Sequence, residues 1–107
     1  MGKLLYNSGE SSFDMDDRVL AHLRIVFMNK LRRNEPFMFQ VPDPNVGTRS
    51  LWVHAAIPVA FSFSGGRNPA IDSRWIEALM HDASGPNGLT YEAAPSYPME
   101  AATAGRR

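Results

Sequence analysis

The segment 16–33 constrains the fold of this chain more than any other part of the sequence. At about 100° per residue, its apolar side chains gather on one broad face, which is typical of a surface helix that packs on a core. Asp16 suits the N-cap and Asp17 the first turn, while Asn34 and Pro36 end the helix. The apolar stripe consists of Val19, Leu20, Leu23, Val26, Phe27 and Leu31.

The opposite face of this helix is basic and is the best candidate for a contact surface. It includes one apolar side chain, Ile25, and an apolar residue within a basic face hints at a binding role. Arg49 would add to this face if its strand hairpin folds beside the end of the helix. An ordinary solvated helix face has a similar composition, so both interpretations stay open. The candidate binding residues are Arg18, His22, Ile25, Asn29, Arg32, Arg33 and Arg49.

Alternation of apolar and polar residues predicts strands on both sides of this helix. The expected strands are residues 3–7, 12–15, 36–41, 50–56, 59–63 and 88–93, and a second helix begins at Asp72 or Ser73 and runs to about Ala83. Gly85 and Pro86 are the stop signals of that second helix.

The order of these elements, β(β)αβββαβ, predicts an α+β fold with two layers. Three consecutive strands with short connections favour one antiparallel sheet containing 37–41, 50–55 and 59–63, with both helices on one face. The residues expected in the core are Leu20, Leu23, Phe27, Leu31, Phe37, Phe39, Leu51, Val53, Phe61, Phe63, Ile76 and Leu79.

Length and charge limit the organisation of the chain and its partners. A chain of 107 residues fits one domain, expected over residues 1–94, followed by a flexible C-terminal tail, 95–107, that has no periodicity. Eleven basic residues balance eleven acidic ones, so any attraction to nucleic acid has to be local.

The absence of cysteine excludes disulfides, thiolate zinc sites and thiol nucleophiles, and it fits a cytoplasmic protein. The N-terminus lacks the features of a signal peptide, and no segment approaches the roughly 20 apolar residues of a membrane span. We therefore expect no membrane partner.

No catalytic residue, metal site or cofactor is predicted. His22, His54 and His81 do not stand at a spacing that favours metal binding. The acidic residues within 14–17 lack the ligand ladder of a calcium loop, and helix capping explains them more simply. Residues 64–67, Ser-Gly-Gly-Arg, lack the longer glycine frame and the Lys-Ser/Thr of a P-loop, so they predict a turn.

Four segments carry a resemblance to a known family: GKLLYNS, DDRVLAHLRIVFMNKLRRNEPF, LWVHAAIPVAFSFSG and WIEALMHDASGPNGL. Over about residues 2–93 the chain resembles a family of small actinobacterial and actinophage proteins of unknown function, some of which are labelled ATP-dependent DNA ligases. The resemblance implies no established catalytic residues. Neither Lys3 nor Lys30 stands in the K-x-D-G motif of such ligases, so the residues themselves predict no nucleotidyl transfer.

Two functions from different classes follow. The first is a non-catalytic binding module, regulatory or accessory to nucleic-acid metabolism, that uses the basic face of helix 16–33. Its partner is expected to be a protein or a second copy of the chain, with nucleic acid as a further option. The alternative is a small enzyme, associated with a ligase or similar to a hydrolase, whose Asp, His and Arg side chains are assembled by the fold. An enzyme should show a concave pocket with convergent polar groups.

Overall fold

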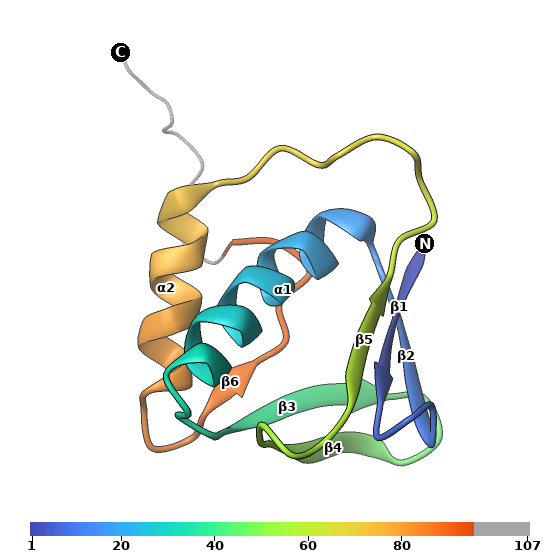
Figure 1. Ribbon diagram of the computed structural model, residues 1–107. Helices are drawn as coiled ribbons and strands as arrows, with labels where there is room; N and C mark the ends of the chain where they lie inside the picture. Colours follow the sequence, from blue (N-terminus) through green and yellow to red (C-terminus); the bar gives the residue numbers. More distant parts are fainter. Residues whose placement is uncertain (96–107) are drawn as a thin grey trace.

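The computed structural model describes residues 1–95 and shows an α+β fold with two helices and two three-stranded sheets (Figure 1). Its elements are β1 (Gly2–Tyr6), β2 (Ser11–Met15), α1 (Asp17–Arg32), β3 (Phe37–Asp43), β4 (Gly47–Val53), β5 (Val59–Ser62), α2 (Ser73–Ala83) and β6 (Leu89–Thr90). The predicted class and the predicted order of elements are both confirmed. The tail predicted over 95–107 lies, apart from Pro95, outside the described residues.

Helix α1 begins and ends where its capping residues predict. The carboxylate of Asp16 accepts a hydrogen bond from the backbone N–H of Arg18 at 3.3 Å, as an N-cap does. Beyond the helix, Asn34 adopts a φ of 58°, and its N–H donates to the carbonyl of Leu31 at 3.0 Å. This left-handed residue turns the chain out of the helix, and it leads into β3.

The strands divide between two sheets, so the predicted single meander is wrong. One sheet has the order β2-β1-β5 and the other has the order β4-β3-β6. Although β5 follows β4 in the chain, it pairs antiparallel with β1, and Phe61 lies opposite Leu4. The chain changes sheet at Pro58, whose carbonyl accepts a hydrogen bond from the N–H of Asn7 at 2.8 Å. A two-stranded hairpin is marginally stable alone, and β5 gives the β1–β2 hairpin its third strand.

Strand β6 completes the second sheet in parallel with β3. Leu89 lies opposite Phe39, and the N–H of Tyr91 donates to the carbonyl of Gln40 at 2.9 Å. Before the strand, Gly88 has a φ of +76°, and a Cβ there would lie 2.4 Å from the carbonyl oxygen of Met38. Only glycine fits this close approach. The strand predicted over 88–93 is confirmed at Leu89–Thr90 alone.

The core lies where α1 faces both sheets, and Phe27 is at its centre. This side chain is 2% exposed, and its ring makes edge contacts with three other rings. Phe37 and Phe39 come from β3, with ring centroids 5.1 and 5.6 Å away, and Phe61 comes from β5, at 5.3 Å. One ring of α1 therefore joins the two sheets. Both helices lie on the same side of the β4-β3-β6 sheet (Figure 1).

Most of the predicted core is confirmed as buried, namely Leu20, Leu23, Phe27, Phe37, Phe39, Leu51, Val53 and Leu79. Leu31, Phe61 and Ile76 are only partly buried against this core. The prediction for Phe63 is wrong, because its side chain is 38% exposed. β5 ends at Ser62, and the alternation that predicts an inward side chain at 63 no longer applies beyond the strand.

Replacement of Phe27 by alanine should lower the free energy of unfolding by roughly 3–5 kcal/mol, because it empties the junction between helix and sheets. The matched change Phe63→Ala should cost less than about 1 kcal/mol, since that ring is already exposed to water. Urea unfolding followed by circular dichroism measures both. Equal losses for the two variants would contradict this description of the core.

Candidate functional site: a pocket beside helix α1

Helix α2 covers part of the predicted outer face of α1, and this corrects the placement of His22. That side chain was expected at the surface but is 0% exposed, with its ring centroid 4.4 Å from that of Trp75. Nε2 accepts a hydrogen bond from the backbone N–H of Asp72 at 2.9 Å, and Nδ1 donates to the carbonyl of Arg18 at 2.7 Å. Amphipathic periodicity cannot distinguish a face that meets water from one that meets a second helix, and His22 lies on the latter.

Arg18 and Arg49 are also engaged within the molecule. The guanidinium carbon of Arg18 lies 5.4 Å from the ring centroid of Trp75, so this arginine flanks the contact between the helices. Arg49 lies on β4, 3.6 Å from a carboxylate oxygen of Asp43 and 5.7 Å from the ring centroid of Phe13. Those contacts belong to its own hairpin and to β2, so they do not bring Arg49 to the helix face.

The rest of the predicted face keeps some exposure. Arg32 and Arg33 are exposed at the C-terminal end of α1, and Asn29 is half-buried. Ile25 is half-buried and lines a pocket. Of the predicted residues, Ile25 is the one that lines this pocket.

This pocket, here named the α1 pocket, has a volume of about 480 Å³. It lies between α1 and the segment that connects β5 to α2. The residues that give it chemical character are Arg24, Ile25, Phe63, Arg67, Asn68 and Ile71. Its walls are thus partly apolar, with two guanidinium groups among them.

The segment between β5 and α2 is anchored to α1 at both ends. At its start, the carboxylate of Asp17 accepts hydrogen bonds from the backbone N–H groups of Ser64 at 3.2 Å and Gly65 at 2.8 Å. At its end, His22 holds the N–H of Asp72. Both anchors stand on one helix, so the helix fixes the far wall of the α1 pocket.

The same hydrogen bonds shift the acid–base equilibrium of Asp17. The N–H of Gly65, then that of Ser64, stabilise the ionised carboxylate and hold its pKa below the ordinary value of 3.8. The Asp17 carboxylate is thereby engaged with the backbone of the loop.

The two arginines of the pocket carry charge without a matching carboxylate. Among residues 1–95, neither Arg24 nor Arg67 forms an ion pair, and no acidic side chain lines the pocket. An amino group of Arg24 only approaches the sulfur of Met28, at 3.9 Å. Neither arginine is predicted as a site residue by the sequence alone. Arg24 stands on the flank between the apolar stripe and the predicted face, and Arg67 lies in a glycine-rich turn that only the fold brings near α1.

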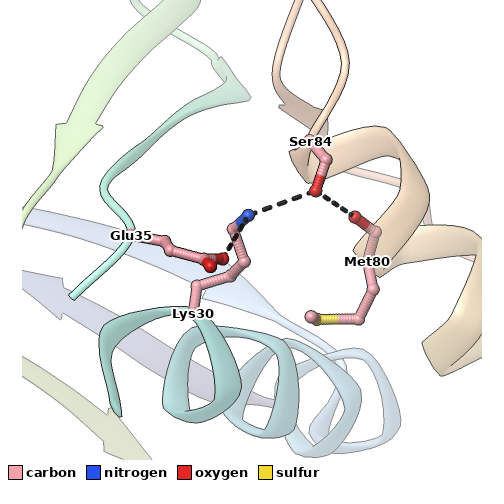
Figure 2. A network of polar contacts seen from close by, with 4 residues as sticks. All are labelled: Lys30, Glu35, Met80 and Ser84. Carbon is pink, nitrogen blue, oxygen red and sulfur yellow. Dashed lines mark hydrogen bonds and ion pairs between the residues drawn. The ribbon is translucent and has the colours of Figure 1, made fainter. Parts of the chain in front are cut away.

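A second polar cluster joins the C-terminal ends of the two helices (Figure 2). The amine of Lys30 lies 3.1 Å from a carboxylate oxygen of Glu35 and donates to the hydroxyl of Ser84 at 3.2 Å. The Ser84 hydroxyl in turn donates to the carbonyl of Met80 at 3.2 Å. A serine–lysine pair can catalyse acyl transfer when the amine accepts the serine proton. In this cluster the amine is a donor and the proton of the hydroxyl is directed to a carbonyl, so the arrangement is that of a structural link.

The acidic residues near the start of α1 serve separate purposes. Asp14 pairs with Lys3 at 2.6 Å, Asp16 caps the helix and Asp17 holds the loop. In the described part of the chain, no three His, Cys, Asp or Glu side chains gather where they could hold a metal ion. No helix within residues 1–95 is long and apolar enough to cross a membrane.

Over residues 1–94 the chain matches the model of a family described as "Domain of unknown function (DUF7882)", and it belongs to that family. The match includes every described helix and strand and the whole of the α1 pocket. No curated protein and no solved structure matches the chain.

The change His22→Phe should lower the free energy of unfolding by roughly 1–3 kcal/mol. A phenyl ring preserves the contact with Trp75 but leaves the N–H of Asp72 without its acceptor. The matched control is His81→Phe, at an exposed position of α2, which should change stability by no more than about 0.5 kcal/mol. Thermal unfolding of both variants measures the change in stability. A His22 variant as stable as its control would show that the hydrogen bond from Asp72 to His22 does not stabilise the fold.

The change Asp17→Asn should destabilise the fold in a pH-dependent way. Because the pKa of Asp17 is lower in the folded protein than its ordinary value of 3.8, the stabilisation is complete above that value. It is lost as the pH falls through the lower, folded-state pKa. Urea midpoints of the parent protein and the variant should therefore differ at neutral pH and converge in acid. A difference that grows as the pH falls would contradict the assignment.

Proposed function

We propose that this member of the DUF7882 family is a non-catalytic binding module that contacts a partner protein through the α1 pocket. The observation that carries the proposal is the presence of two arginines, Arg24 and Arg67, without acidic partners among residues 1–95, in a partly apolar pocket. A surface of this kind suits a partner that presents carboxylate and apolar groups together. The proposed contact surface therefore differs from the basic face predicted on helix 16–33: it shares Ile25 with that face and lies toward the flank that carries Arg24.

Exposed apolar side chains around the pocket support a protein partner. Phe63 is 38% and Ile71 is 48% exposed, and both line the pocket. Met28 is 41% exposed, and its sulfur contacts the side chain of Arg24, which lines the pocket. Large apolar residues that gather at one place on a surface are a feature of interfaces. Complete burial of one such side chain contributes up to roughly 1.5–3 kcal/mol.

Nucleic acid fits this surface less well than an acidic protein does. Binding to a phosphate backbone draws on many basic contacts along a groove or stripe. The α1 pocket has two arginines, while Arg32 and Arg33 stand at the end of α1 and do not line it. The chain as a whole has no net charge. An accessory role in nucleic-acid metabolism would then be exercised through a protein contact.

The alternative function, a small enzyme with an Asp, His and Arg site, has less support. His22 uses both ring nitrogens within the fold, and Nδ1 of His54 accepts the N–H of Ala56 at 3.1 Å. Neither lines the α1 pocket, and the oxygens of Asp17 face the loop backbone. For nucleotidyl transfer, the more enclosed lysine, Lys30, is 7% exposed and held by Glu35.

The test is a titration of the ¹⁵N-labelled full chain with a short peptide of alternating glutamate and valine, blocked at both ends. We expect chemical-shift changes at Ile25 and Gly65, and a loss of affinity of about tenfold in the double variant Arg24→Glu/Arg67→Glu. The control variant Arg32→Glu/Arg33→Glu changes the charge equally but outside the pocket, so its affinity should stay within about threefold of the parent.

Two results would overturn the proposal. One is a larger loss in the control variant than in the pocket variant, which would move the contact surface to the helix end. The other is binding of single-stranded oligothymidylate in preference to the acidic peptide at the same ionic strength, which would make nucleic acid the partner.

A further inference from the structure

The free edge of β5 presents unpaired backbone groups. The N–H of Asn7 donates to the carbonyl of Pro58, and the antiparallel register places Leu5 opposite Ala60 and Lys3 opposite Ser62. In an antiparallel pair, hydrogen-bonded residues alternate with residues whose N–H and C=O point the other way. The backbone groups of Val59 and Phe61 therefore point away from β1, and within residues 1–95 no further strand pairs with β5 on that side.

This edge borders a groove that continues the α1 pocket. A second hollow of about 400 Å³ is lined by Met28 and Leu31 of α1 and by Val59 and Phe61 of β5. Arg24 lines both hollows, so they adjoin along the helix. Figure 1 shows β5 with β1 on one side and α1 on the other. The groove thus runs between a helix and an open strand edge.

The edge also lacks the protection that natural edge strands usually carry. Charged residues or prolines within an edge strand discourage the addition of another strand. The β5 sequence, Val-Ala-Phe-Ser, has neither. The opposite edge of the same sheet, β2, carries Asp14. β5 is therefore the more receptive edge of this sheet.

We propose that an extended segment of a partner protein, with alternating acidic and apolar side chains, binds by adding a fourth strand to the β2-β1-β5 sheet at the edge of β5. Its backbone pairs with Val59 and Phe61, and its carboxylates pair with Arg24 and Arg67. Since side chains alternate between the two faces of a strand, its apolar side chains lie on the opposite face of the sheet, where Leu5 and Ala60 line a hollow. This inference rests on the proposed function and specifies the mode of binding.

Charge favours such a segment over a second copy of the chain at this edge. A two-fold pairing of β5 with itself would bring Arg24 and Arg67 of both copies to one interface. In the part of the chain that the structure describes, no acidic residue lines the two hollows, so neither copy would offer a carboxylate there. An acidic partner segment supplies the carboxylates that Arg24 and Arg67 lack in the groove.

Backbone methylation of the probe peptide tests the pairing directly. Two versions of the blocked glutamate–valine peptide carry N-methyl groups, one on every valine and the other on every glutamate. Since alternate N–H groups of an added strand face β5, one version should lose binding at least about tenfold and the other should retain it. In the complex of the full chain with the unmodified peptide, amide hydrogen exchange at Val59 and Phe61 should slow by at least about tenfold. Ala60, already paired with β1, should change little.

A charge exchange provides the matched control. The double variant Arg24→Glu/Arg67→Glu should bind a lysine–valine peptide better than the glutamate–valine peptide, with the same protection of Val59 and Phe61. If the acidic peptide perturbs Ile25 and Gly65 while Val59 and Phe61 stay unprotected and both methylated peptides bind equally, strand addition is wrong and the binding function stands. If the acidic peptide binds nowhere on the chain, both proposals fail.

Discussion

The arrangement of the two helices depends on the contacts that the buried ring of His22 makes with Asp72 and Trp75. Nε2 of His22 holds the backbone N–H of Asp72, and the Asp72 carboxylate accepts the N–H groups of Arg74 and Trp75 as the cap of α2. The histidine thus fixes the residue that begins the second helix. Since that residue also ends the connection from β5, the position of the α1 pocket wall follows from the same hydrogen bond.

Helix α1 acts as a common support because each part of its surface has a different neighbour. Phe27 faces the two sheets, His22 and Lys30 face the two ends of α2, and Asp17 faces the loop after β5. The remaining flank, around Arg24, is not covered by any helix or strand of residues 1–95 and forms one side of the groove. The proposed binding surface is thus the flank of the helix that the other elements of residues 1–95 leave uncovered.

Local patterns in the sequence predict the elements well and their partners poorly. The bounds of α1 are predictable because capping by Asp16 and termination at Asn34 are decided within a few residues. The pairing of β5 is decided by the open edge of β1, more than fifty residues away, and no local signal identifies it. The parallel pairing of β6 with β3 likewise depends on the position at which α2 ends, and no local signal identifies that position.

The candidate site shows the same division. Ile25 is predictable because an apolar residue on a polar helix face is visible in the sequence, and its side chain lines the pocket. The prediction of an exposed His22 is wrong because α2 covers that side of the helix. Arg67 and Ile71 contribute to the pocket only through the two anchors of their loop, which lie on a helix far away in the sequence.

The central position of β1 has a consequence for the way this protein comes to fold. Its first neighbour, β2, follows after a short turn, but its second neighbour spans Val59–Ser62, and the helix and one complete hairpin lie in between. During synthesis the first hairpin emerges with one edge open, and it keeps that edge until more than half of the chain has been made. Closing so long a loop is slow compared with forming local turns. The N-terminal sheet is therefore among the first parts of the molecule to begin and among the last to be completed.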